Sequence, residues 1–77
     1  MRKTDTPLPK FVICIEADEE DDLEVRKIYQ VLPDETAAEV DYLRVIDDSG
    51  EDYLYPTDQF VPVSFTPEVE RAILQAA

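Results

Sequence analysis

The chain of 77 residues has room for one small core, and it carries 19 acidic residues against seven basic ones, for a formal net charge of -12. It has no His, one Cys and one Gly, which excludes a His-based catalytic triad, a Cys/His zinc site, a disulfide framework and the glycine-rich phosphate loops. Hydrophobic residues make up 44%, too many for a disordered acidic tail, so we expect a folded domain.

The first residues, 1–9, include two prolines and predict an extended, mobile lead-in to a single domain over residues 10–77. The apolar run FVICI at residues 11–15 favours a strand buried on both faces, with Cys14 as an inert core thiol. The next segment, EADEEDDLE at residues 16–24, holds seven carboxylates that repel one another. It therefore predicts a solvated loop with Leu23 as its one large apolar anchor.

The segment VRKIYQVL at residues 25–32 is ambiguous between a strand and an amphipathic helix. Its β-branched and aromatic content, and the stop at Pro33, favour the strand. One helical turn over residues 34–38, capped by Asp34, is expected to follow.

A β-hairpin is the clearest prediction, with arms at residues 42–46 and 53–55 around a polar turn at residues 47–52. The only glycine, Gly50, falls where the turn needs a positive φ. The acids of this turn are expected to be exposed and to titrate alike, so they are not expected to form a catalytic pair.

A turn of 3₁₀ helix at residues 56–59 should lead to a last strand at residues 60–65, placed at a sheet edge because Pro62 has no N–H to donate. A C-terminal helix over residues 67–76 is predicted to begin with Thr66 as its cap. Its single apolar stripe is too short to be stable alone, so the helix should dock on the domain or on a partner. The elements together predict a mainly β fold, a small five-stranded barrel with a short C-terminal helix.

Two segments resemble SH3 domains. Residues 16–25 look like their first long acidic loop and the strand that follows it. Residues 53–62, YLYPTDQFVP, are similar to the SH3 ending, in which a strand runs into Pro, a 3₁₀ turn, an aromatic residue and Val. The resemblance implies an SH3-like barrel. The chain lacks the Trp and the Tyr pair with which SH3 domains line a proline-peptide groove, and only Pro56 and Phe60 can be carried over.

A second resemblance covers more of the chain. The pattern IYQVLPDE, LRVIDDSGEDYLYP and FVPV is similar to a group of small, uncharacterised bacterial proteins, and implies only a compact stand-alone protein.

The acidic surface is expected to repel nucleic-acid backbones and anionic membranes and to attract a basic protein or peptide. In Tyr53-Leu54-Tyr55, strand alternation places the two tyrosines on one face, and Leu54 in the core would leave both tyrosines partly outside. The predicted partner-binding residues are Glu19, Glu20, Asp21, Asp22, Tyr53, Tyr55 and Phe60. No catalytic residue, cofactor or dedicated metal site is predicted, although the acidic loop could bind a divalent cation weakly.

The favoured hypothesis is therefore a non-enzymatic interaction or adaptor module for a basic partner. The alternative is a DNA-mimic or antitoxin-like inhibitor of a basic nucleic-acid-binding protein, and a third reading is a structural subunit whose C-terminal helix packs against a copy of itself. The sequence leaves the oligomeric state open. The short apolar runs and the single free cysteine favour the cytoplasm.

Overall fold

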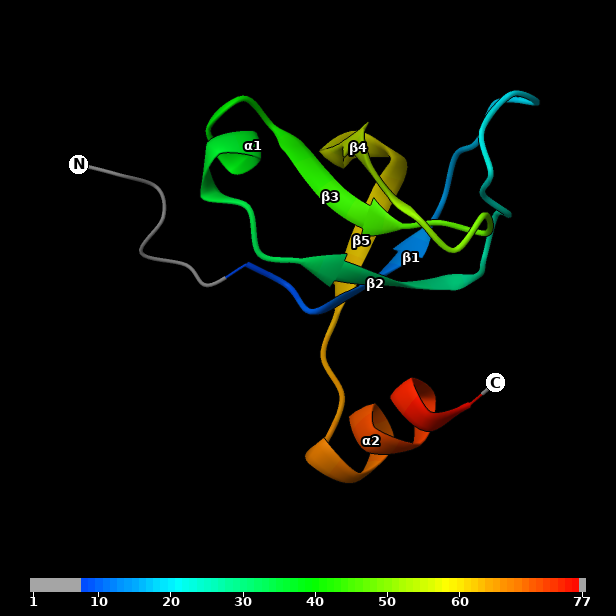
Figure 1. The fold of residues 1–77 in the computed structure, drawn as a ribbon, viewed down its shortest axis with the longest axis vertical. Helices are drawn as coiled ribbons and strands as arrows, with labels where there is room; N and C mark the ends of the chain where they lie inside the picture. The colour runs from blue at the N-terminus through cyan, green and yellow to red at the C-terminus, as the bar shows by residue number, and fades with distance from the viewer. Residues whose placement is uncertain (1–7, 77) are drawn as a thin grey trace.

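The computed structural model describes residues 8–76, so most of the predicted lead-in lies outside the described residues. Five antiparallel strands form one sheet in the order β4-β3-β2-β1-β5 (Figure 1). The elements are β1 (Phe11–Cys14), β2 (Ile28–Leu32), α1 (Glu35–Glu39), β3 (Tyr42–Ile46), β4 (Asp52–Pro56), the 3₁₀ helix η2 (Thr57–Gln59), β5 (Phe60–Val63) and α2 (Pro67–Gln75). The prediction of a mainly β fold with a short C-terminal helix is confirmed.

The sheet is strongly curled, because its two edge strands are consecutive in the chain. The three residues of η2 join β4 to β5, although these strands lie at opposite edges of the sheet. The rings of Tyr55 on β4 and Phe60 on β5 accordingly meet edge to face, with centroids 6.1 Å apart. Within residues 8–76 no ladder pairs β4 with β5, so the sheet is not closed into a barrel.

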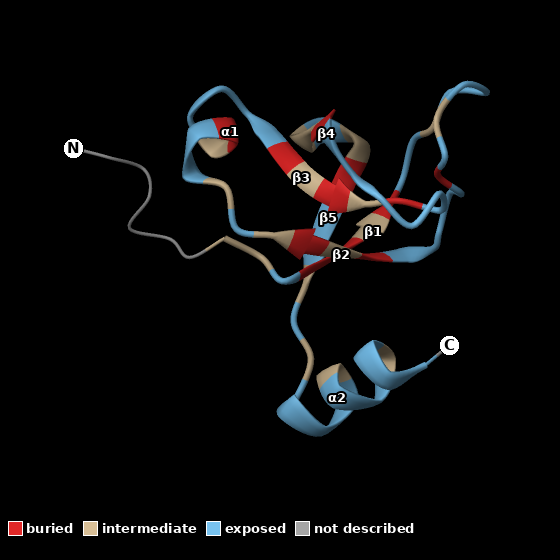
Figure 2. Cartoon of the chain, in the orientation of Figure 1, coloured by how far each residue is buried: buried red, intermediate tan, exposed pale blue. Residues whose placement is uncertain are grey.

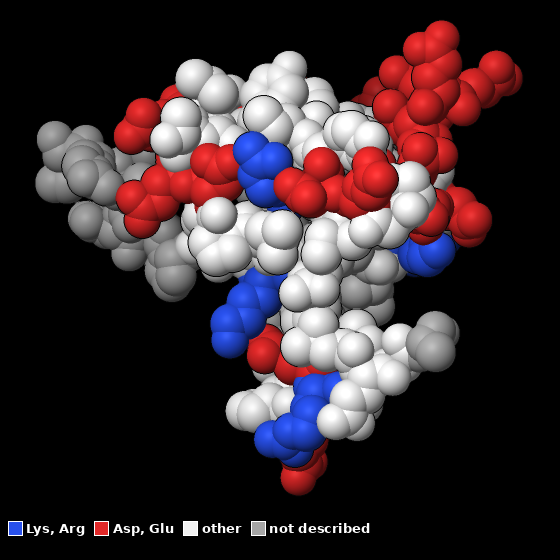
Figure 3. Space-filling view, in the orientation of Figure 1, with Lys and Arg blue, Asp and Glu red and all other residues white. Residues whose placement is uncertain are grey.

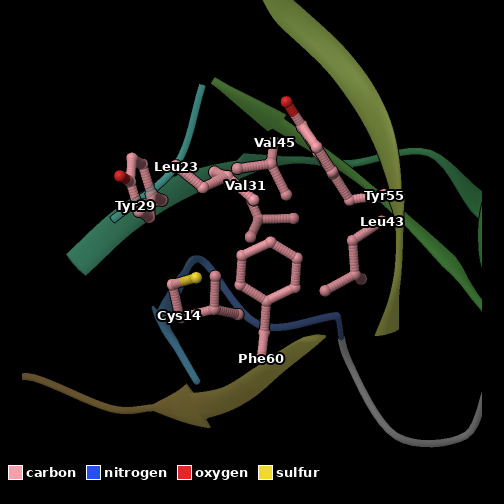
Figure 4. Close-up of a cluster of buried hydrophobic side chains, with 9 residues drawn as sticks. Cys14, Leu23, Tyr29, Val31, Leu43, Val45, Tyr55 and Phe60 are labelled. Atoms are coloured by element: carbon pink, nitrogen blue, oxygen red, sulfur yellow. The ribbon is translucent and has the colours of Figure 1, made fainter. Parts of the chain in front are cut away.

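The hydrophobic core fills the concave side of this curled sheet (Figures 2 and 4). Every strand contributes to it, and Leu23 enters from the acidic loop as predicted. The buried cluster consists of Val12, Cys14, Leu23, Tyr29, Val31, Leu43, Val45, Tyr55 and Phe60. Cys14 is fully buried, and burial raises the pKa of its thiol, which fits the predicted inert core residue.

The ambiguous segment is a strand, as preferred, but it begins only at Ile28. The residues before it form a turn in which Arg26 takes a φ of +76° while its N–H donates to the carbonyl of Cys14 at 2.7 Å. The predicted turn of helix is α1, and its Asp34 cap is confirmed, since Oδ1 accepts from the N–H of Ala37 at 3.0 Å.

The predicted hairpin is β3 and β4, with Gly50 at φ +86° as expected. The expected orientation of β4 is wrong: Tyr55 is buried, whereas Leu54 is 45% exposed. The register explains this, because Tyr55 pairs with Leu43 and Leu54 pairs with Arg44. Directly paired residues point to the same face, so Tyr55 joins Leu43 in the core.

The C-terminal part also follows the prediction, with β5 and its Pro62 at a sheet edge. Helix α2 has Pro67 in its first turn, and the Oγ1 of Thr66 caps it by accepting from the N–H of Val69 at 3.2 Å. Figures 1 and 2 show α2 standing below the sheet, and none of its described residues is buried. Helix α2 therefore packs only slightly on its own domain, less than expected from the sequence.

Candidate functional site

The acidic loop, residues 16–24, connects β1 to β2 and projects from one end of the molecule (Figure 3). A tight turn shapes its middle: the N–H of Asp21 donates to the carbonyl of Asp18 at 3.0 Å, and the N–H of Asp18 donates to Oδ2 of Asp21 at 3.0 Å. Leu23 anchors the far side in the core. The loop is solvated, as predicted, but it has a defined conformation.

Two other elements fasten this loop from outside. Gln59 of η2 donates from Nε2 to the carbonyl of Glu16 at 2.9 Å and to Oδ2 of Asp21 at 3.1 Å. At the β3–β4 turn, the N–H of Asp48 donates to the carbonyl of Asp22 at 2.8 Å. The loop is thus held at its start, at its middle and near its end by residues distant in sequence.

A polar cluster around Asp48 completes the attachment. The two carboxylate oxygens of Asp48 accept hydrogen bonds from Lys27 Nζ at 2.6 Å and from the Tyr29 hydroxyl at 2.9 Å. The Tyr29 hydroxyl in turn accepts from the N–H of Glu24 at 2.7 Å. The ammonium of Lys27 also lies 5.6 Å from the centroid of the Tyr29 ring. Burial, and then the hydrogen bond to Asp48, raise the pKa of Tyr29, while the hydrogen bond to Asp48 raises that of Lys27.

Asp47 contradicts the expectation that the hairpin acids are exposed and alike, because it is only 5% exposed. Its Oδ1 accepts from the N–H and hydroxyl of Ser49 at 2.9 and 2.5 Å, and its Oδ2 accepts from the Tyr55 hydroxyl at 2.7 Å. Burial alone would raise the pKa of Asp47, but these hydrogen bonds outweigh burial and leave it below its ordinary value. The carboxylate therefore organises the turn.

Arg44 holds two further carboxylates on the outer face of the sheet. Its Nε donates to Asp34 Oδ2 at 2.8 Å, and its Nη1 donates to Asp52 Oδ2 at 2.9 Å. The pKa of Asp34 is lowered first by the N–H of Ala37 and then by Arg44. Asp34 thus joins the start of α1 to β3 and is occupied within the fold.

The seven predicted partner-binding residues separate into two groups. Glu19, Glu20, Asp22 and Tyr53 are exposed and Asp21 is half-buried, so five of the seven remain accessible. Tyr55 and Phe60 lie in the core at 9% and 5% exposure, so the expectation that they form a surface patch is wrong. Both rings are needed where the two edges of the sheet meet.

Sequence reasoning missed the residues that position the loop. Lys27 and Asp48 are 21 positions apart, and no local pattern relates them. The role of Asp47 did leave a signal, because an Asp followed two residues later by Ser and then Gly is typical of a turn closed by the Asp side chain.

Within residues 8–76, no group of three or more carboxylate or thiol side chains is arranged to hold a metal ion. Among the same residues, no helix is long and apolar enough to cross a membrane. The chain matches no protein-family model, no curated protein and no solved structure.

Proposed function

We propose that this chain is a non-enzymatic interaction module that binds a basic protein or peptide segment through the acidic loop. One observation carries the proposal: Glu19, Glu20 and Asp22 are exposed on a loop fastened at three points. Within residues 8–76 these three carboxylates form no ion pair. They are therefore available to Lys or Arg side chains of a partner.

The fastening matters for affinity. A loop that is already ordered loses less conformational entropy on binding than a mobile one, so more of the electrostatic attraction appears as binding free energy. The attraction between opposite charges also steers the approach of the partner.

Tyr53 extends this surface. It is 50% exposed, and its hydroxyl donates to Glu51 at 2.9 Å. That hydrogen bond raises the pKa of Tyr53. An exposed ring beside carboxylates can stack on an Arg guanidinium.

For the fold, we propose a half-open relative of the SH3 barrel. In support, a long acidic loop separates β1 from β2, and β4 ends at Pro56 before a 3₁₀ turn and the aromatic Phe60. Since Phe60 is buried and the chain has no Trp, proline-rich peptides are not the proposed partner.

Mimicry of DNA is less well supported. It requires free carboxylates spaced along one extended face. Outside the loop, however, Asp34 and Asp52 are paired with Arg44, and Asp48 is paired with Lys27. Exposed acids also remain on α1 and α2, but they belong to separate elements, whereas Glu19, Glu20 and Asp22 lie together on one loop. This grouping favours the loop as the docking element.

The test is a titration of the protein with an Arg-rich peptide, followed by calorimetry at low and physiological salt. The loop variant carries Glu19→Gln, Glu20→Gln and Asp22→Asn. The matched control, Glu35→Gln with Glu39→Gln and Glu68→Gln, removes the same charge from exposed positions on α1 and α2.

We expect the loop variant to bind at least tenfold more weakly and the control to bind almost as the wild type does, with affinity falling as salt rises. Equal weakening in both variants would show that only the net charge matters, and would overturn the assignment to the loop. Affinity that does not respond to salt would overturn the electrostatic mechanism.

A further inference from the structure

The convex side of the sheet, opposite the core, carries an apolar row. Ile13 pairs with Ile28 on β2 and with Val61 on β5, and directly paired residues point to the same face. Since the neighbours of Ile13, Val12 and Cys14, point into the core, this row points away from it. Ile28 and Val61 are 39% and 40% exposed.

A groove of about 470 Å³ separates this side of the sheet from α2. The helix side of the groove is apolar, with Ile73, Leu74 and Ala76. The sheet side combines the apolar Phe11, Ile28 and Ile46 with polar residues, among them Lys27, Gln30, Asp47 and Asp48. Leu74 is 55% exposed. We call the six apolar residues and the row beside them the α2 face.

Helix α2 has little support from its own chain. It has nine residues, and a helix of that length is marginal in water without tertiary packing of its apolar side. Within residues 8–76, it is attached by the 3.6 Å ion pair of Glu70 with Lys10 and, just before it, by the edge-to-face contact of Phe65 with Phe11, with ring centroids 5.7 Å apart. Further burial of its apolar side would stabilise it.

The charge around the α2 face differs from that of the loop. Lys27 lines the groove beside Asp47 and Asp48, and on α2 Arg71 follows Glu70, which pairs with Lys10. Bases and acids are therefore mixed around the α2 face, whereas the projecting loop in Figure 3 carries acids and no basic residue. A basic partner therefore gains little at this face, while another copy of this acidic chain meets its least repulsion here.

We propose that the α2 face binds the same face of a second copy, with α2 of each protomer covering the apolar row of the other. In such a symmetric contact each face meets an identical face, on which Lys10 and Lys27 already neutralise Glu70 and Asp48. The contact would bury Leu74, Ile28 and Val61, which a monomer leaves in water. The proposal does not depend on the function assigned to the acidic loop.

The test is sedimentation equilibrium of the full chain across the micromolar range. We expect a mass of twice the 8.8 kDa of one chain. Leu74→Ser on the helix and Ile28→Ser on the sheet should each weaken dimerisation about tenfold or more, since each removes a large apolar side chain from the contact. The control is Val40→Ser at the end of α1, a side chain that is 66% exposed and outside the face.

Circular dichroism checks that each variant is folded, and the two face variants alter different elements, so a folding defect in one leaves the other informative. The loop variant described above should dimerise at least as strongly as the wild type, since it removes three repelling charges outside the contact. A monomer throughout the range would overturn the proposal, and so would a dimer that both face variants leave intact.

Discussion

The Tyr55 hydroxyl offers a sharp test of the turn that positions the acidic loop. Tyr55→Phe removes one oxygen, which donates to the buried carboxylate of Asp47 at 2.7 Å, and leaves the ring in place against Phe60. A hydrogen bond to a charged group contributes about 1.5–3 kcal/mol. Because Ser49 still provides two donors to Asp47, we expect the low end, about 1.5 kcal/mol. For a domain of this size that loss lowers Tm by roughly 6–12 °C.

Urea denaturation of wild type and variant at several pH values measures this contribution. The pKa of Asp47 is lowered in the fold. Its ionised carboxylate therefore contributes to the free energy of unfolding above the ordinary aspartate pKa of about 3.9, and this contribution is lost as pH falls through the pKa of the folded state. The difference between wild type and Tyr55→Phe should therefore shrink below about pH 4. Tyr53→Phe is the matched control, since it removes an exposed hydroxyl from the same strand and should leave the midpoint unchanged. A Tyr55→Phe variant as stable as wild type at neutral pH would refute the reasoning.

Three further predictions concern the backbone and the second buried tyrosine. Arg26→Gly should stabilise the fold by about 1 kcal/mol in urea denaturation because it relieves a φ of +76°, whereas Arg26→Ala, which keeps the strain, should not. Gly50→Val should cost about 2 kcal/mol through strain at φ +86° alone, since nothing lies within 4 Å of the added Cβ, and an unchanged thermal melt would reject the turn conformation. Because the pKa of Tyr29 is raised in the fold, its contribution to the free energy of unfolding is present below about pH 10 and is lost as pH rises through the folded value. The stability of Tyr29→Phe should therefore fall less steeply with alkaline pH than that of the wild type.

The elements themselves could be predicted because their signals are local. The apolar run at β1, the caps Asp34 and Thr66, and the turn glycine Gly50 each depend on neighbours within four residues. The choice of strand over helix for β2 was right because β-branched residues outweighed a helical spacing that the segment also satisfied.

Which side chains of β4 point into the core could not be predicted, because this depends on the register of β4 against β3. Alternation requires Leu54 and Tyr55 to point to opposite sides, and hydrophobicity alone places the leucine inside. The actual choice follows from the turn, which pairs Ile46 with Asp52 and so sets Tyr55 opposite Leu43. The buried Asp47 then supplies a partner for the phenol, which a leucine in that position could not use.

The charge of -12 therefore does not describe a uniform surface. The fold uses Lys27 and Arg44 to hold Asp48, Asp34 and Asp52, and leaves Glu19, Glu20 and Asp22 exposed at one end. The α2 face, by contrast, combines apolar side chains with acids and bases that pair within the protomer. Salt separates the two proposed contacts, since screening weakens attraction of a basic peptide to the loop but also weakens repulsion between two acidic chains. Added salt should release the peptide while it preserves or strengthens the dimer. If salt instead changed peptide binding and dimerisation in the same direction, one surface would have to serve both contacts.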